Sequence, residues 1–149
     1  MEIERKYLIR QSDIPFDPIK YPCRHIEQGY LCTNPVVRIR RDNDDYFLTY
    51  KSKGFLAREE YNLPLTPEAY RHLKEKVDGH IITKERYVIP LENNLCIELD
   101  FFSGSLSGLI LAEVEFPDEA AANSFLPPDW FGKDVTYSSE YHNSTLSRQ

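Results

Sequence analysis

The chain has 149 residues, which suits a single domain with a sizeable hydrophobic core, and it contains neither a linker nor a repeat of fixed period. Hydrophobic residues make up 41% of it and aromatic residues 13%, with 10 Tyr and 8 Phe, a composition typical of globular proteins rich in strands. The net charge of -6 argues against a nucleic-acid-binding surface, which is usually basic.

The three cysteines, Cys23, Cys32 and Cys96, are odd in number and lack a CxxC spacing, so the sequence predicts neither a disulfide framework nor a zinc site. Charge begins at residue 2, which excludes a signal peptide, and no apolar run approaches the roughly 18 residues that a membrane span needs. We therefore expect a cytoplasmic protein with reduced thiols and no membrane partner.

The first half of the chain is expected to form strands at residues 1–9, 25–31, 36–41, 46–53 and 57–63. Residues 11–22 form a connection, because each of its prolines biases the preceding residue away from helix. Gly29 inside the second strand indicates a bulge or a close backbone approach. Turns are expected at Asn34-Pro35, at the Asp/Asn-rich residues 42–45 and at Lys53-Gly54.

A helix follows, with Thr66 as its N-cap and Pro67 at its first position. Tyr70, Leu73 and Val77 give it an apolar stripe, and Asp78-Gly79 is expected to end it.

The second half of the chain is expected to form three more strands, at residues 81–89, 95–102 and 109–116. A short helix begins at Asp118 and stops at Leu126-Pro127-Pro128, and the piece from Ser138 to Leu146 is a further helix candidate. About eight strands in mostly antiparallel succession, with small helices between them, predict an α+β barrel or curled sheet.

Charged residues occupy alternate positions in seven of these segments. In the first strand, Glu2, Glu4 and Lys6 share one face, because strand side chains alternate. The other pairs are Arg38/Arg40, Lys51/Lys53, Arg58/Glu60, Lys84/Arg86, Glu98/Asp100 and Glu113/Glu115. On a single strand this pattern is typical of a solvated face. The recurrence of all-basic and all-acidic pairs indicates a functional cavity instead.

Such pairs suit metal-bound phosphate chemistry if the strands close with their charged faces inward. An unpaired buried ion costs several kcal/mol, so opposite charges or ligands must compensate it. Clustered Lys and Arg favour a polyanion, and Arg pairs suit forked contacts with phosphate oxygens. Clustered carboxylates would repel the same phosphates unless divalent cations lay between them, as Mg²⁺ commonly does.

The sequence resembles the CYTH superfamily, also called triphosphate tunnel metalloenzymes, whose ExExK signature matches Glu2-x-Glu4-x-Lys6. The resemblance continues in order through Gln28-Gly29-Tyr30-Leu31, the six charged pairs, Val135-Thr136 and Tyr141-x-Asn143-x-x-Leu146. It implies a single CYTH domain over residues 1–149, formed by an eight-stranded antiparallel barrel with short flanking helices and a C-terminal helix that closes one mouth. It also implies a small polyanionic substrate, tripolyphosphate or an organic triphosphate, with Mg²⁺ or Mn²⁺ as cofactor.

The resemblance further implies roles for individual residues. Substrate phosphates would be bound by Lys6, Arg38, Arg40, Lys51, Lys53, Arg58, Lys84 and Arg86. Metal would be bound by Glu2, Glu4, Asp100, Glu113 and Glu115, and the catalytic set would be Glu2, Glu4, Lys6 and Glu115. Glu60, Glu98 and Asp100 could each bind metal, orient water or pair with the bases. Roles stay open for Asn62, which stands where many relatives have an acid, for Lys133 and for His25, His72, His80 and His142.

The leading functional hypothesis is a metal-dependent triphosphatase that hydrolyses inorganic tripolyphosphate to pyrophosphate and phosphate by in-line attack of water. A small chain without a recognisable nucleobase or thiazole pocket favours a substrate that is little more than phosphate. The alternatives are a nucleoside or thiamine triphosphatase, a class IV-type adenylate cyclase, a non-catalytic polyphosphate-binding module, and a sheet with charged outer faces and no site. The sequence leaves the oligomeric state open.

Overall fold

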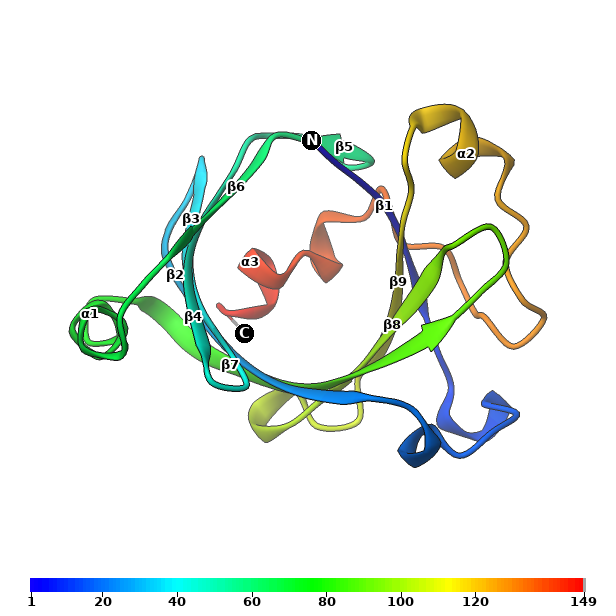
Figure 1. Ribbon diagram of the computed structural model, residues 1–149, viewed down its shortest axis with the longest axis horizontal. Helices are drawn as coiled ribbons and strands as arrows, with labels where there is room; N and C mark the ends of the chain where they lie inside the picture. Colours follow the sequence, from blue (N-terminus) through cyan, green and yellow to red (C-terminus); the bar gives the residue numbers. More distant parts are fainter. Residues whose placement is uncertain (149) are drawn as a thin grey trace.

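The computed structural model describes residues 1–148 as one antiparallel sheet of nine strands that curls into a nearly closed barrel (Figure 1). The strands are β1 (Glu2–Leu8), β2 (Cys23–Thr33), β3 (Val36–Asp42), β4 (Asp45–Lys51), β5 (Ala57–Arg58), β6 (Glu60–Pro64), β7 (Asp78–Pro90), β8 (Cys96–Phe102) and β9 (Ile110–Glu115). Their order in the sheet is β5-β1-β9-β8-β7-β2-β3-β4-β6. The predicted antiparallel α+β barrel is therefore confirmed.

The chain itself closes the barrel between β5 and β6. Arg58 of β5 pairs with Glu2 of β1, whereas Glu60 of β6 pairs with Lys51 of β4 at the other end of the sheet. Glu59 lies between the two strands, and its backbone hydrogen bonds go to Ser52, from Ser52 N to Glu59 O at 3.0 Å and from Glu59 N to Ser52 Oγ at 2.9 Å. This break divides the strand predicted at residues 57–63 and gives nine strands in place of eight.

Strand β2 is irregular at Gly29. Its pairing with β7 shifts register between Gln28 and Tyr30. A Cβ atom on Gly29 would lie 2.7 Å from a Val77 methyl group and 2.8 Å from Ile81 Cδ1. Both features that the sequence predicted here, a bulge and a close approach, are present.

Helix α1 (Pro67–Lys74) lies outside the barrel against β3 and β4 (Figure 1). As predicted, Thr66 caps it, because its hydroxyl oxygen accepts from the amide of Ala69 at 3.1 Å. The helix ends at Lys74, earlier than predicted, since Asp78 and Gly79 already belong to β7. Asp78 pairs with Tyr30 of β2, so Asp78 and Gly79, which resemble a helix end in the sequence, form part of the sheet.

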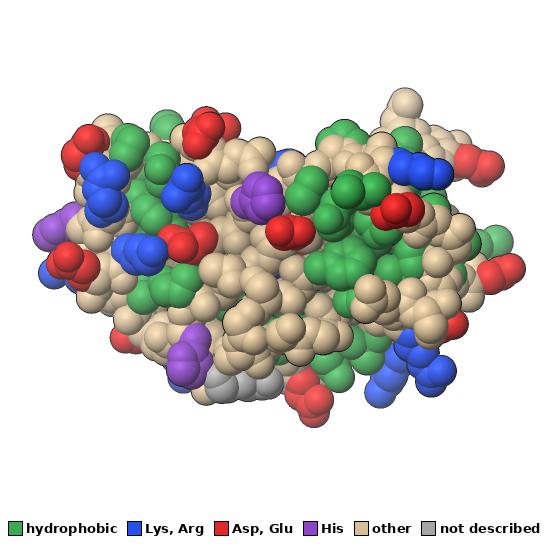
Figure 2. Space-filling model, turned by 90° about the horizontal axis from the view of Figure 1, so that it is seen from below, with side chains coloured by type: hydrophobic (Ala, Val, Ile, Leu, Met, Phe, Trp, Pro, Cys, Tyr) green, Lys and Arg blue, Asp and Glu red, His purple; other side chains and the backbone are tan. Residues whose placement is uncertain are grey.

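Apolar side chains cover the outside of β1, β8 and β9. Ile3, Leu99 and Val114 belong to a buried cluster on this side, joined by aromatic residues of the chain after α2 (Glu119–Ser124). Helix α2 covers part of this side (Figure 1), and as predicted it is capped by Asp118. On the surface seen from below, hydrophobic side chains also gather toward one end of the molecule (Figure 2). The larger apolar cluster therefore lies outside the barrel wall, and the charged faces of these strands point inward.

The C-terminal piece crosses the barrel opening as a 3-10 turn, η4 (Ser139–Tyr141), and a short helix, α3 (Asn143–Leu146) (Figure 1). Leu146 is buried in a second apolar cluster with Tyr30, Val36 and Val135. The helical piece predicted at residues 138–146 is thus present. Over residues 1–148, no helix is long and apolar enough to cross a membrane.

Candidate active site

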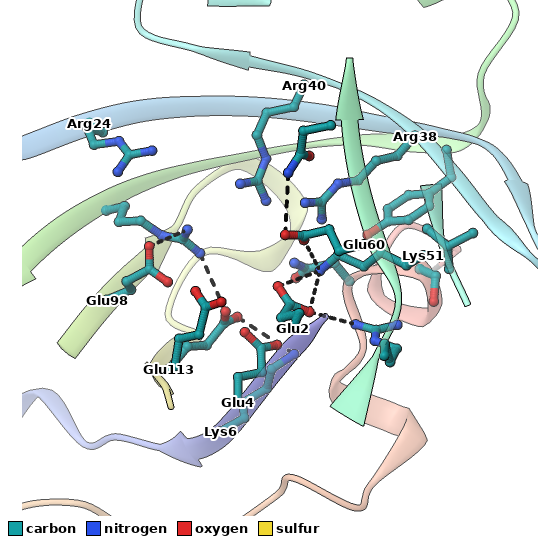
Figure 3. A pocket seen from close by; sticks show the side chains of 18 residues that line it. Glu2, Glu4, Lys6, Arg24, Arg38, Arg40, Lys51, Glu60, Glu98 and Glu113 are labelled. Atoms are coloured by element: carbon teal, nitrogen blue, oxygen red, sulfur yellow. Dashed lines mark hydrogen bonds and ion pairs between the residues drawn. The ribbon is translucent and has the colours of Figure 1, made fainter. Parts of the chain in front are cut away.

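A cavity of about 150 Å³ lies inside the barrel, and each of the nine strands contributes a side chain to its wall (Figure 3). Its acidic lining residues are Glu2, Glu4, Glu60, Glu98, Glu113 and Glu115. Its basic lining residues are Lys6, Arg24, Arg38, Arg40, Lys51, Arg58 and Arg86. Most of the alternating charges singled out in the sequence are therefore brought together, with seven basic and six acidic side chains among the described residues.

The neighbouring strands β1 and β9 place the carboxylates of Glu4, Glu113 and Glu115 side by side. Glu4 pairs with Glu115 and Lys6 with Glu113, so the inward faces of the two strands coincide. Burial, the Glu113 carboxylate and the Glu2 carboxylate raise the pKa of Glu4 to about 8. Within residues 1–148, no Lys or Arg lies within 4.0 Å of Glu4, although its neighbours are paired. This part of the cavity is short of positive charge.

Glu2 is held by basic residues from β4 and β5. Lys51 Nζ lies 3.0 and 3.2 Å from its two carboxylate oxygens, and Arg58 Nη2 lies 3.9 Å from Oε1. Burial alone would raise the pKa of Glu2, but the charge of Lys51 and its hydrogen bonds to Glu2 lower it to about 2. Glu2 is therefore ionised at neutral pH, and Lys51, which also lies 3.3 Å from Glu60, is shared between two carboxylates.

Glu113 connects the two ends of the charged network. Lys6 Nζ lies 3.7 Å from its Oε1 atom, and Arg86 Nη2 lies 3.6 Å from its Oε2 atom. These cations outweigh the effect of burial and hold the pKa of Glu113 well below its ordinary value. Lys6 Nζ also donates to the backbone carbonyl of Tyr141 at 3.1 Å, which joins the C-terminal segment to the cavity.

Arg38 and Arg40 form a second part of the wall, which is short of negative charge. Arg40 donates from Nε and Nη2 to Gln28 Oε1 at 3.0 and 2.6 Å, but an amide carries no charge. Burial, Arg38 and Arg86 lower the pKa of Arg40 to about 9. Arg38 Nε is buried without a hydrogen-bond partner, and in the described part of the chain no carboxylate lies within 4.0 Å of either guanidinium.

Three residues expected in the site do not line the cavity. Lys53 is exposed in the turn after β4, because that strand ends at Lys51, before the predicted end. Lys84 and Asp100 also face inward, but they are fully buried beyond the cavity lining, with Lys84 Nζ 2.7 Å from Asp100 Oδ2. The sequence showed that both side chains face inward. It did not show the register between β7 and β8, which pairs Arg86 with Asp100.

The structure adds lining residues that sequence reasoning missed, chiefly Arg24, Tyr30, Asn143 and Ser144. Arg24 makes a two-bond ion pair with Asp42. It escaped notice because β2 carries no second charge two residues away that would complete an alternating pair. Tyr30, Asn143 and Ser144 are uncharged, and the search for charged pairs could not have found them.

The residues whose roles were left open are also placed. Glu60, Glu98 and Asn62 line the cavity, and Asn62 Oδ1 accepts from Thr49 Oγ1 at 2.6 Å. Lys133 is exposed and does not line it. His25, His72 and His80 are exposed. His142 is half-buried, and burial together with the nearby cations, Lys6 first, lowers its pKa to about 4.

The fold and cavity define a class of protein, an antiparallel barrel that encloses basic and acidic side chains in one tunnel. Residues 1–147 match the family model described as the CYTH domain, and the chain belongs to this family, as the sequence predicted. It is 38% identical over 149 residues to an inorganic triphosphatase from Nitrosomonas europaea. The alignment covers 98% of this chain and 96% of that protein.

A second curated relative and a solved structure show the same full-length similarity. An inorganic triphosphatase from Acetivibrio thermocellus is 36% identical over 152 residues, covering 97% of this chain and 92% of that protein. The crystal structure of the inorganic triphosphatase NE1496 superposes with a TM-score of 0.72 at 36% identity, covering 100% of this chain and 95% of the other.

Proposed function

We propose that this protein is a triphosphatase that hydrolyses inorganic tripolyphosphate to pyrophosphate and phosphate inside the barrel. The similarity to two curated inorganic triphosphatases over nearly their whole length supports this proposal. On this reading the enzyme is a hydrolase of phosphoric anhydride bonds, and its substrate is a small polyanion.

The observation that carries the proposal is a cavity that holds basic and acidic side chains without partners of opposite charge among residues 1–148. Figure 3 shows Arg38 and Arg40 on one side and Glu4 and Glu113 on the other. Among residues 1–148, no carboxylate lies within 4.0 Å of the Arg38 or Arg40 guanidinium, and no Lys or Arg lies within 4.0 Å of the Glu4 carboxylate. Such an arrangement costs free energy unless a ligand supplies the missing charges. A phosphate chain together with a cation would supply both.

The size and lining of the cavity favour an inorganic substrate. A water-sized group needs about 10–15 Å³ of cavity volume, so a cavity of about 150 Å³ holds roughly ten to fifteen of them. Tripolyphosphate carries ten oxygens. Among the described lining residues only Val36 is aliphatic and only Tyr30 aromatic, which leaves little apolar surface for a nucleobase or a thiazole ring.

The carboxylates around Glu4 suit Mg²⁺ or Mn²⁺. No group of three or more His, Cys, Asp or Glu within residues 1–148 is arranged to hold a metal by itself. Mg²⁺ is usually held by one or two carboxylates plus substrate phosphates, so a site shared with the substrate fits these residues. Glu2, Glu4, Glu113 and Glu115 would hold the metal, which when bound would neutralise phosphate charge and activate water.

The remaining cavity residues have roles that follow from their partners. Arg38 and Arg40 would bind phosphate oxygens first, because no carboxylate of residues 1–148 is paired with them. Lys6, Lys51, Arg58 and Arg86 already contact carboxylates, and they would share their charge between the carboxylates and the substrate. The catalytic set proposed here is Glu2, Glu4, Lys6 and Glu115, each of which lines the cavity.

Phosphate release from tripolyphosphate, ATP and thiamine triphosphate, measured in parallel with Mg²⁺, Mn²⁺ or EDTA, tests this function. We expect metal-dependent release that is fastest with tripolyphosphate and abolished by EDTA. Cyclic AMP from ATP would identify a cyclase instead. Stabilisation of the fold by tripolyphosphate without any phosphate release would identify a binding module and contradict the proposal.

A further inference from the structure

We propose that Asp100 is a positioning residue that orients the guanidinium of Arg86 toward the cavity. This inference deepens the proposed function, because it assigns a role in binding the triphosphate. Asp100 has no exposed surface, whereas Arg86 is 4% exposed and lines the cavity. Arg86 donates from Nε to Asp100 Oδ1 at 2.7 Å and from Nη2 to Asp100 Oδ2 at 2.8 Å.

The hydrogen bonds of Arg86 leave a defined pair of donors for a ligand. A guanidinium has five N–H groups in a rigid plane. Two donate to Asp100, and one on Nη1 donates to Glu98 at 2.9 Å. One N–H group therefore remains on Nη1 and one on Nη2. Glu113 lies 3.6 Å from Nη2, so these two N–H groups lie on the side of the guanidinium that faces Glu113. Asp100 fixes the plane, so it determines where these two donors point.

Asp100 is itself fixed by a second cation. Lys84 Nζ lies 2.7 Å from Asp100 Oδ2, and the side chain of Lys84 has no exposed surface. The same nitrogen lies 5.2 Å from the centre of the Phe102 ring, which covers it from another direction. Removing the Asp100 charge would leave both Lys84 and Arg86 with less compensation, so the guanidinium would lose its orientation.

This geometry differs from the role of metal ligand that the sequence suggests for Asp100. Both of its oxygens accept from Arg86, and one also contacts Lys84. A metal ion at Asp100 would have to displace one of these cations. The two roles make different predictions for the same variant, because a positioning residue affects phosphate binding whereas a metal ligand affects the metal requirement.

Asp100→Asn tests the proposal, since it keeps the size of the side chain and removes its charge. We expect KM for tripolyphosphate to rise at least tenfold with kcat changed less than threefold, and half-saturating Mg²⁺ to stay within twofold. The matched control is Glu27→Gln on the outside of the barrel, where Glu27 lies 2.9 Å from Lys74 and accepts from Tyr70 at 2.7 Å. This control should lower the melting temperature and leave KM within twofold.

Three results would overturn the proposal. A KM for Asp100→Asn within twofold of the unmodified protein, with an unchanged Mg²⁺ requirement, would show that the contact is only structural. An unchanged KM with a tenfold higher Mg²⁺ requirement would show that Asp100 is a metal ligand. Action through Arg86 is tested separately, because in an Arg86→Ala background Asp100→Asn should change KM less than twofold. A further tenfold rise there would contradict it.

If Asp100→Asn does not fold, Lys84→Met/Asp100→Asn compared with Lys84→Met gives the same test with one cation fewer. Binding is also measured without turnover, as the rise in melting temperature that tripolyphosphate causes in EDTA. Asp100→Asn should lose most of that rise, and Glu27→Gln should keep it. If the unmodified protein shows this rise but releases no phosphate, the proposed hydrolysis fails while the positioning role is still decided.

Discussion

At the scale of single residues, Glu4 shows how this site trades stability for binding. Its carboxylate is buried beside Glu2 and Glu113, and these surroundings raise its pKa to about 8. A buried carboxylate without a basic partner destabilises the fold unless it takes up a proton or a cation. Such residues are typical of functional sites, where they are kept for a ligand.

Replacing Glu4 by Gln should therefore separate stability from activity. We expect Glu4→Gln to reduce phosphate release about 100-fold or more, because it removes a proposed metal ligand. Its melting temperature in EDTA should be equal to or above that of the unmodified protein, because Gln needs neither a proton nor a cation to be buried beside Glu2 and Glu113. Glu85→Gln, on the exposed outer face of β7, serves as the control. A variant that melts several degrees lower in EDTA yet stays active would contradict this assignment.

Single residues also show how much of the site can be predicted from the sequence. The alternation of charged residues selected Glu2, Arg38, Arg40 and most of the other side chains that line the cavity. Once the inward face of a strand is known, its two-residue period is enough to say which side chains point inward. The alternation could not show that β4 stops at Lys51, which leaves Lys53 outside. Nor could it show that Lys84 and Asp100 are buried together beyond the cavity lining, since that depends on the depth of each position in the closed barrel.

At the scale of elements, α1 is fastened to the outside of the barrel by a small polar network. Glu27 of β2 accepts from the Tyr70 hydroxyl at 2.7 Å and lies 2.9 Å from Lys74 Nζ. Burial alone would raise the pKa of Glu27, but the bonds with Lys74 and Tyr70 lower it below its ordinary value. The network thus favours the ionised carboxylate in the folded state.

This lowered pKa predicts a pH-dependent contribution to stability. It is fully present above the unfolded pKa of about 4.5 and is lost as the pH falls through the lower pKa of the folded state. Glu27→Gln should lower the free energy of unfolding by about 1–2 kcal/mol at pH 7. Urea unfolding at pH 7 and pH 3 measures this difference, which should shrink at the lower pH. A difference that is the same at both values would contradict the role of this ion pair.

Element boundaries were predicted where local chemistry decides them. Thr66 and Asp118 begin their helices as expected, because a side-chain cap acts within a few residues. The end of α1 and the break at Glu59 depend on distant strands: β2 pairs with Asp78, and β5 and β6 pair with opposite ends of the sheet. Local patterns carry no information on those partners.

At the scale of the whole molecule, the barrel separates its two kinds of surface. Apolar side chains pack outside the wall under α2, whereas the interior holds the charged network (Figures 1 and 3). Adjacent residues on one strand can therefore meet entirely different surroundings. Arg40 lines the cavity, and Arg41, the next residue of β3, is exposed and donates to the Asn43 carbonyl at 2.8 Å.

The kinetics of tripolyphosphate hydrolysis by Arg40→Gln and Arg41→Gln test most directly whether the barrel interior is the active site. The two variants remove the same charge from neighbouring positions, so net charge and composition stay matched. We predict that Arg40→Gln raises KM for tripolyphosphate at least tenfold, and that Arg41→Gln leaves it within twofold of the unmodified protein. Equal effects of the two substitutions, or a larger effect of Arg41→Gln, would contradict a site inside the barrel.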